Sequence, residues 1–250
     1  MFLLIIKFIL TSNFCILLWI FLDSIYQYLH LYHYRVDYSQ VKTESFFYKI
    51  LFRLPKLIAQ YIEEKRSDEF KEHGLIIFTG KQGQGKTMAM TYCINKLILK
   101  YPDLKIATNY GLICQDLALS SYEPLLYLDN GFQGLVFGLD EIQATFNSRS
   151  WKEFPPDLLA CICQNRKAHR VIYGTAQNIS QVDKAIRLQC RRYCKCYTFF
   201  GFFTVVLKFE PEFNFEGNLD KSKFRGLFFF LQEEALRYQY NTFDIIKSLR

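Results

Sequence analysis

Residues 75–100 read LIIFTGKQGQGKTMAMTYCINKLILK, and this stretch decides the fold. Its first five residues form an apolar run of the kind that makes a buried strand. The next eight, Gly80 to Thr87, read GKQGQGKT and match the pattern GxxxxGK(S/T). Residues 88–100 have helical spacing and end before Pro102. The stretch therefore predicts a strand, a glycine-rich loop and a helix in succession.

The glycine-rich loop has the groups that phosphate binding requires. Its glycines let backbone N–H groups turn inward, and the N-terminus of the following helix favours anions. Lys86 would reach the β and γ oxygens, and the Thr87 hydroxyl would ligate Mg²⁺. We therefore expect ATP with Mg²⁺ as the ligands, and the nucleotide-binding residues are predicted to be Gly80, Lys81, Gln82, Gly83, Gln84, Gly85, Lys86 and Thr87.

A second buried-strand run, residues 135–139, ends in Asp140 and Glu141. A parallel strand delivers such carboxylates to the carboxyl edge of the sheet, where the phosphate loop also lies. Asp140 would hold the metal ion, and Glu141 would orient and deprotonate the attacking water. An acidic pair at a strand end is common, but together with the loop it indicates a Walker B motif and an ATPase.

Two further residues are candidates for catalysis. A third apolar run, residues 171–176, leads to Gln177, which is a γ-phosphate sensor or, equally, a strand-end amide bonded to the backbone. Multimeric ATPases often bring an arginine across a subunit interface to stabilise transition-state charge. Among the arginines after the second strand we favour Arg187 for this role, with Arg149 and Arg166 as the alternatives.

The amino terminus predicts a membrane anchor. Residues 2–22 contain Lys7 as their one charge, and a helix of that length spans about 31 Å, the thickness of a bilayer core. Basic residues follow the span, so the bulk of the chain should face the cytoplasm. A cleaved signal peptide and a buried core helix are the alternatives. Residues 46–66 read either as a membrane-surface helix or as a solvated linker helix.

The composition and length agree with one catalytic domain and one accessory segment. Half of the residues are apolar and 18% are aromatic, which excludes a disordered chain. The net charge of +7 suits contact with nucleic acid or anionic lipid, but it also suits an ordinary basic surface. The eight cysteines lack the spacing of a disulfide scaffold, and Cys190, Cys194 and Cys196 lack the partners of a zinc site. We expect buried, reduced thiols.

Further apolar runs complete the predicted α/β fold, a P-loop NTPase with a mainly parallel sheet flanked by helices. Strands are expected near residues 75–79, 104–109, 135–139 and 170–176, with a hairpin at the sheet edge over 193–198 and 202–209. Residues 231–250 look helical. The predicted organisation is a transmembrane anchor at 1–22, a basic and aromatic linker at 23–70, an ATPase core at 71–210 and a helical extension at 211–250.

From Asp140 the sequence reads DEIQATFNSRSWKEFPPDLLACICQNRKAHRVIYGTAQNISQVDKAIR. Its DE, R-x-W, RK, T-A-Q and VD-x-x-x-R elements, in this order, resemble the zonula occludens toxin-like family, the inner-membrane assembly ATPases of filamentous phages. The likeness runs from the phosphate loop to about Arg192, with YQYNT at 238–242 as a closing echo. It implies a RecA/FtsK-like ring motor in the host inner membrane that drives virion assembly and export. Phage coat or export proteins would be its partners, and single-stranded DNA is a further candidate.

Members of that family commonly have their membrane span after the ATPase domain, whereas here the apolar segment comes first. This difference leaves open a DNA translocase or packaging ATPase of the FtsK/HerA type, and a membrane scaffold that does not hydrolyse ATP. The intact Lys86, Thr87, Asp140 and Glu141 argue against the scaffold. A translocase should show DNA-stimulated hydrolysis with steep salt dependence, but the sequence has no recognisable DNA-reading module, which favours assembly.

Overall fold

The computed structural model describes residues 14–26, 45–66, 69–145 and 156–240. The chain separates into two compact units, Met1–Asp68 and Glu69–Arg250. The predicted nucleotide-binding residues all belong to the second unit, so the two units are described in turn.

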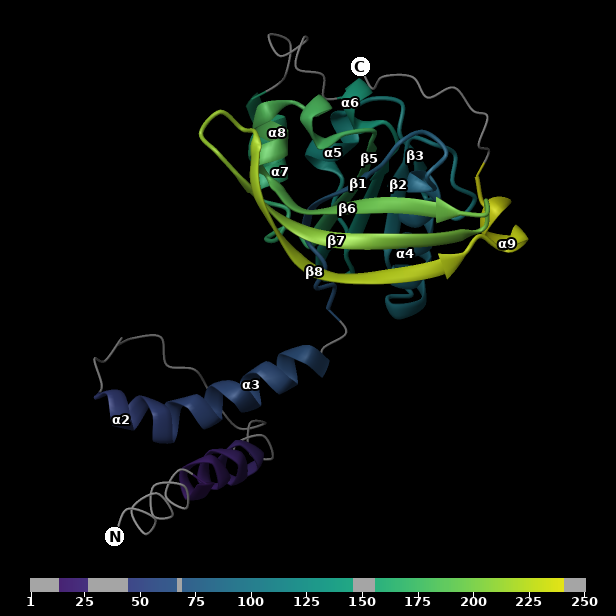
Figure 1. Cartoon of the computed structure of the whole chain (residues 1–250). Helices are drawn as coiled ribbons and strands as arrows, with labels where there is room; N and C mark the ends of the chain where they lie inside the picture. Colours follow the sequence, from purple (N-terminus) through teal and green to yellow (C-terminus); the bar gives the residue numbers. More distant parts are fainter. Residues whose placement is uncertain (1–13, 27–44, 67–68, 146–155, 241–250) are drawn as a thin grey trace. The chain divides into compact units, whose positions relative to one another are not determined.

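The first unit is helical where it is described (Figure 1). Residues 14–26 form a helix whose Trp19 indole donates a hydrogen bond of 3.3 Å to the Leu51 carbonyl oxygen. Within the described residues, no helix combines the length and the apolar composition needed to cross a bilayer. Residues 2–13 of the predicted span lie outside the described ranges. The other elements of the unit are α2 (Phe46–Tyr48), the π-helix η2 (Lys49–Arg53) and α3 (Leu54–Arg66).

The second unit is built on one eight-stranded sheet in the order β3-β2-β4-β5-β1-β6-β7-β8 (Figure 1). The neighbours from β3 to β6 pair in parallel, and β6, β7 and β8 pair antiparallel. The prediction of a mainly parallel sheet flanked by helices is confirmed. The strands are β1 (Gly74–Thr79), β2 (Lys105–Thr108), β3 (Leu117–Ala118), β4 (Leu135–Leu139), β5 (Arg170–Ala176), β6 (Cys190–Phe199), β7 (Phe203–Phe213) and β8 (Leu219–Leu231).

Helices cover both faces of this sheet, which is why the central strands are apolar throughout. Side chains of β1 alternate between two cores: Ile76 and Phe78 pack in the cluster with α4 (Lys86–Lys100), while Leu75 and Ile77 pack in the cluster with the helices on the opposite face. The opposite face has α5 (Glu123–Tyr127), α6 (Ile142–Thr145), α7 (Pro156–Cys163) and α8 (Lys184–Leu188), and short 3₁₀ turns occur at η3 (Gly131–Gln133) and η5 (Ile179–Gln181).

The carboxyl-terminal part of the domain corrects the predicted helical extension over 211–250. Strand β7 continues to Phe213, and β8 pairs with it as far as Leu231. The apolar run at the end of β8 fits a helix or a strand equally by its pattern, and pairing with β7 decides for a strand. Among the described residues of this region, the helix that follows is the short α9 (Glu234–Arg237). Residues 241–250 lie outside the described ranges.

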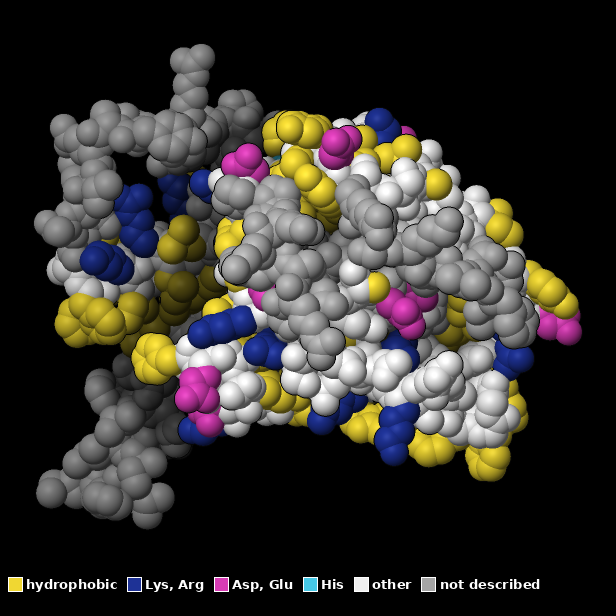
Figure 2. Space-filling model, turned by 90° about the horizontal axis from the view of Figure 1, so that it is seen from above, with side chains coloured by type: hydrophobic (Ala, Val, Ile, Leu, Met, Phe, Trp, Pro, Cys, Tyr) yellow, Lys and Arg dark blue, Asp and Glu magenta, His cyan; other side chains and the backbone are white. Residues whose placement is uncertain are grey.

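The antiparallel ribbon of β6, β7 and β8 has one face against α4 and one face with exposed apolar side chains. Phe230 is buried against α4, whereas Leu227, Phe229 and Leu231, which point to the other face, are exposed. Figure 2 shows exposed hydrophobic side chains among Lys and Arg side chains on the surface of the molecule.

The cysteines include buried, partly buried and exposed thiols, with Cys93 and Cys161 partly buried. Cys190, Cys194 and Cys196 on β6 are buried, as predicted, and burial raises the pKa of the Cys194 thiol to about 12. These thiols are therefore protonated and unreactive at neutral pH. The prediction is wrong for three cysteines with exposed side chains, namely Cys15, Cys114 and Cys163.

Phe70 closes the amino edge of the sheet. Its side chain is buried, and its N–H group donates a hydrogen bond of 3.0 Å to the carbonyl oxygen of Phe132 in the turn before β4. Its ring packs edge-on against Tyr101 with the centroids 5.1 Å apart. Gly134 lies directly beneath, because a Cβ atom there would come within 2.1 Å of the Phe70 ring. The chain thus enters the domain at the edge opposite to the carboxyl ends of the parallel strands.

We expect Gly134→Ala to destabilise the domain by about 1–3 kcal/mol more than Gly131→Ala, because only the first substitution overpacks the Phe70 ring. Both glycines have positive φ, 89° and 56°, but a Cβ at Gly131 meets nothing within 4 Å. Urea unfolding of both variants, followed by circular dichroism, measures the difference. Equal midpoints for the two variants would show that the Phe70 contact is not tight.

Candidate functional site

The site lies where β1, β4 and β5 end at one edge of the sheet. Strand β5 pairs in parallel with β1 on one side and with β4 on the other. The loop after β1 therefore lies one strand away from the acidic pair after β4. A hydrogen bond of 3.3 Å from the Gly80 N–H group to the Gln177 carbonyl oxygen joins the start of this loop to the end of β5.

The glycine-rich loop turns sharply into α4. Gly85 precedes the helix with φ 72° and ψ 27°, in the left-handed region that glycine adopts without steric cost. Its carbonyl oxygen accepts the first helical hydrogen bond, 2.8 Å from the Ala89 nitrogen. A Cβ atom at Gly85 would come within 2.7 Å of the Thr198 hydroxyl oxygen on β6. Glycine is therefore required here both by the backbone angle and by the neighbouring strand.

The structure brings the two predicted metal ligands together. Lys86 and Thr87 are the first two residues of α4, and the Thr87 hydroxyl donates a hydrogen bond of 2.9 Å to Oδ1 of Asp140. The Lys86 ammonium donates a bond of 3.2 Å to the Lys81 carbonyl oxygen within the loop. Hydroxyl and carboxylate oxygens are the ligands that Mg²⁺ prefers. The donor set thus fits the metal ion that the motifs predict.

Two residues to which the sequence analysis assigned no role in the site hold Asp140 in place. Asn109, which follows β2, accepts a hydrogen bond of 2.7 Å from the Asp140 N–H group and donates one of 3.1 Å to the Asp140 carbonyl oxygen. Thr175, which is buried on β5, donates its hydroxyl hydrogen to Oδ1 of Asp140. The carboxylate therefore accepts bonds from both Thr87 and Thr175, which fixes its position.

Glu141 has a strained backbone. Its φ of 50° lies in the left-handed region, which costs a non-glycine residue about 1–2 kcal/mol. The Thr175 hydroxyl oxygen accepts a hydrogen bond of 2.9 Å from the Glu141 N–H group. The same hydroxyl thus donates to Asp140 and accepts from Glu141, so it sets the conformation of the whole acidic pair. The Glu141 side chain remains exposed at the site.

A cavity of about 410 Å³ joins these groups. Its wall includes most of the predicted loop residues, together with both acids and Thr175. It also includes residues from the carboxyl-terminal segment, for which the sequence predicted no role in the site. The lining residues are Gln82, Gly83, Gly85, Lys86, Thr87, Met88, Asp140, Glu141, Thr175, Gln232, Arg237 and Tyr240.

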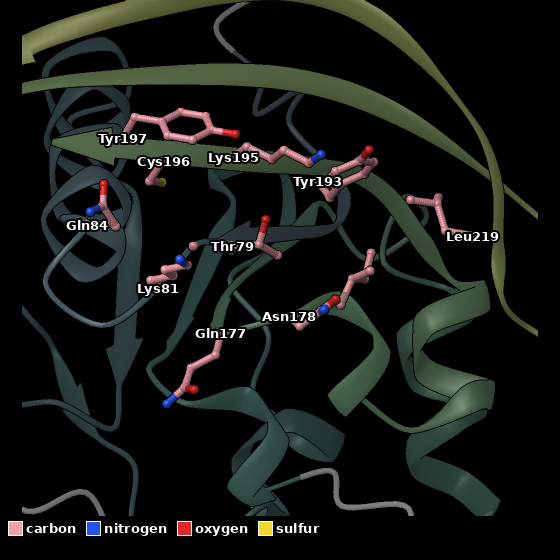
Figure 3. A pocket seen from close by; sticks show the side chains of 12 residues that line it. Thr79, Lys81, Gln84, Gln177, Asn178, Tyr193, Lys195, Cys196, Tyr197 and Leu219 are labelled. Atoms are coloured by element: carbon pink, nitrogen blue, oxygen red, sulfur yellow. The ribbon is translucent and has the colours of Figure 1, made fainter.

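A second cavity of about 530 Å³ lies beside the loop on the side of β6 (Figure 3). Lys81, Gln84 and Gln177 line this second cavity together with residues of β6 such as Lys195. Among the described residues that line it there is no carboxylate, so it lacks the metal ligands of the first cavity. Gln84 also ties the loop to β6, because its Oε1 accepts a hydrogen bond of 2.9 Å from the Thr198 N–H group.

The structure does not place Gln177 as a γ-phosphate sensor. Its side chain is exposed and lines the second cavity, while its backbone carbonyl contacts the loop at Gly80. Thr175, two residues earlier on β5, is the residue that contacts Asp140. The signal for Thr175 was a hydroxyl inside an otherwise apolar strand.

Arg187 is buried within its own domain, which argues against the role of an arginine finger predicted for it. Its side chain is only 8% exposed, and Nη1 donates a hydrogen bond of 3.0 Å to the Ser180 carbonyl oxygen. A buried guanidinium held within its own domain cannot reach the site of a neighbouring subunit. Arg166 is exposed but precedes β5, at the amino edge of the sheet, and Arg149 lies outside the described residues.

The fold is similar to several solved structures. The N-terminal domain of zonular occludens toxin from Neisseria meningitidis is 17% identical, with a TM-score of 0.49. The match covers 67% of this chain and 98% of that domain. The genome packaging NTPase B204 of Sulfolobus turreted icosahedral virus 2, in complex with sulfate, is 13% identical, with a TM-score of 0.40 over 61% and 96% of the two chains. The flagellar accessory protein FlaH from Methanocaldococcus jannaschii is 15% identical, with a TM-score of 0.35 over 60% and 83%.

The structural neighbours thus include a domain of the family that the motifs after Asp140 resemble. The sequence matches no family model, and no curated protein is significantly similar to it. The assignment of the site therefore depends on its own geometry.

We expect Thr175→Val to lower Mg²⁺-dependent ATP turnover about 10- to 100-fold, because it removes one hydrogen bond to a carboxylate and leaves the Glu141 N–H group without an acceptor. Thr175→Ser keeps the hydroxyl and should retain most of the activity. Thr91→Val is the matched control, since Thr91 is an equally buried threonine on α4 whose hydroxyl contacts Tyr110 rather than an acid. Equal activity of the two valine variants would contradict the role of Thr175.

Proposed function

We propose that this protein binds ATP with Mg²⁺ and hydrolyses it. The observation that carries the proposal is the cavity in which Lys86, the Thr87–Asp140 pair and Glu141 meet. These are the cation, the metal ligands and the base that phosphoryl transfer to water requires. They come from two motifs of the sequence, the glycine-rich loop and the acidic pair, and the fold brings both motifs to one edge of the sheet.

Each group has a defined task in the reaction. The loop N–H groups and the Lys86 ammonium hold the β and γ phosphates and neutralise their charge. Thr87 and Asp140 would hold Mg²⁺, which would stabilise the negative charge of the phosphates. The Glu141 carboxylate accepts a proton from the water whose oxygen bonds to the γ phosphorus. The bond from the γ phosphorus to the bridging oxygen breaks, and ADP and phosphate leave.

Lys86→Ala should abolish ATP binding, because the ammonium that contacts the β and γ oxygens is gone. Glu141→Gln should bind ATP but hydrolyse it at least about 100-fold more slowly, because an amide cannot accept the proton from water. Binding and turnover measured on the same preparations separate these two effects. Lys96→Ala on the same helix is the control, because that ammonium lies over the Tyr92 ring, away from the loop. Wild-type turnover in Lys86→Ala would refute the proposal.

We further propose that ATP hydrolysis drives the assembly and export of a filamentous virion, and that the motor is a homo-oligomeric ring at the host inner membrane. The motif series from Asp140 to Arg187 supports this proposal, as does the apolar segment 2–22. A DNA translocase or packaging ATPase is the second candidate. The two differ in their activator: DNA should accelerate a translocase in a steeply salt-dependent way, and an assembly motor should respond to coat or export proteins.

Full-length protein should remain in the membrane fraction after extraction at high pH, because a span of residues 2–22 is held by burial in hydrocarbon rather than by charge. Deleting residues 1–34 should release the protein into the soluble fraction with its ATPase activity retained. In right-side-out spheroplasts a carboxyl-terminal tag should survive external protease. Full-length protein that washes off at high pH does not span the membrane, and a tag cut from outside would reverse the orientation.

A further inference from the structure

The carboxyl-terminal segment forms one wall of the nucleotide cavity. Gln232, Arg237 and Tyr240 line it together with the acids Asp140 and Glu141. The segment reaches this place because the ribbon of β6, β7 and β8 ends beside α4. A Cβ atom at Gly85 would lie 3.0 Å from the Gln232 amide nitrogen, so the end of β8 adjoins the phosphate loop directly.

This segment is fixed to the domain. The Gln239 carbonyl oxygen accepts a hydrogen bond of 2.8 Å from the Ile113 N–H group, and its side-chain oxygen accepts one of 2.7 Å from the Asn95 amide on α4. The Tyr240 ring packs edge-on against Tyr110 with the centroids 5.5 Å apart. The segment is therefore a permanent part of the cavity wall.

The guanidinium of Arg237 is held at a defined position. Its Nε donates a hydrogen bond of 3.0 Å to the Gln232 carbonyl oxygen, and its Nη2 donates one of 2.5 Å to the carbonyl oxygen of Gly201 in the β6–β7 turn. Among the described residues, no hydrogen bond partner faces Nη1. The side chain is exposed, so the guanidinium plane is accessible from the cavity.

The two ends of the cavity impose a direction on a bound nucleotide. The terminal phosphate belongs beside the metal ligands and the base, which lie on the side of β4 and β5. The phosphate loop occupies the middle. The nucleoside must therefore extend toward the other end, where Arg237 is tied to the β6–β7 turn and to the end of β8.

We propose that the carboxyl-terminal segment forms the nucleoside-binding end of the site, and that the Arg237 guanidinium lies against the purine base. This inference builds on the proposed function. A planar guanidinium stacks on an aromatic face. The Arg237 guanidinium is held in place by hydrogen bonds to two carbonyl oxygens, which do not neutralise its positive charge. The interaction would contribute to the affinity for ATP and ADP, and not to the affinity for a bare chain of phosphates.

The test compares two ligands, ATP and inorganic tripolyphosphate, each with Mg²⁺, by calorimetric titration of the full-length protein. Arg237→Ala should raise the Kd for ATP about three- to fivefold and leave the Kd for tripolyphosphate unchanged. Arg237→Lys keeps the positive charge and a donor for the carbonyl oxygens but loses the plane, so it should behave like Arg237→Ala. Arg225→Ala is the control, because Arg225 is an exposed arginine on β8 paired with Glu210.

Equal losses for both ligands, with rescue by Arg237→Lys, would overturn the inference and place Arg237 at the phosphates. Unchanged ATP binding in Arg237→Ala would remove Arg237 from the site. Thermal unfolding without ligand serves as the structural readout: a loss of ATP affinity in Arg237→Lys at an unchanged Tm supports the direct contact. Wild-type protein that binds neither ligand contradicts the proposed function and this inference together, whereas the first two outcomes overturn this inference alone.

Discussion

Strand β5 forms parallel hydrogen-bond ladders with β1 on one side and β4 on the other, and the proposed nucleotide site depends on this arrangement. Because β5 separates the other two strands, its own last residues fill the gap between the phosphate loop and the acids. Thr175 meets Asp140 and Glu141 on one side, and the Gln177 carbonyl oxygen meets Gly80 on the other. One intervening strand, β5, therefore separates the cation of the loop from the carboxylates. The hydrogen-bond ladders of β5 keep this separation constant.

The same ladder explains how the strain at Glu141 is maintained. A left-handed glutamate would relax in a loop that was free to move. Here the residue before it is held by Asn109 on the β2 side and by Thr175 on the β5 side, and the residue after it, Ile142, is fully buried. These surrounding contacts hold the strained backbone of Glu141 and offset the free-energy cost of its left-handed conformation. The Glu141 side chain therefore stays exposed at the site.

The sequence was sufficient for the parts of the site that depend on local chain geometry. Gly85, Lys86 and Thr87 are determined by the turn from a strand into a helix, and Asp140 by the end of an apolar strand, so their places at one edge of the sheet could be predicted. Thr175 and Asn109 act across strand pairs, and no spacing along the chain reveals which strand is inserted between two others. Arg237 was beyond reach for the same reason, because β8 had to be recognised as a strand before its end could be placed.

Arg187 illustrates the opposite case, a residue that the sequence suggested for catalysis and that lies buried in the structure. The sequence suggested a catalytic role for this arginine. In the structure the Arg187 side chain is buried and donates a hydrogen bond to the Ser180 carbonyl oxygen of the same domain. Burial is a property of the packed domain, and charge patterning along the chain does not report it.

The packing of Phe70 has a practical consequence for handling the protein. Since the chain enters this domain at the amino edge of the sheet, a fluorophore or a solid support attached directly before residue 69 of the isolated domain would lie at the edge opposite to the cavity. Tyr240, near the other end of the described domain, lines the cavity. A bulky group attached at Tyr240 would crowd this cavity, so immobilisation chemistry belongs on the amino-terminal side.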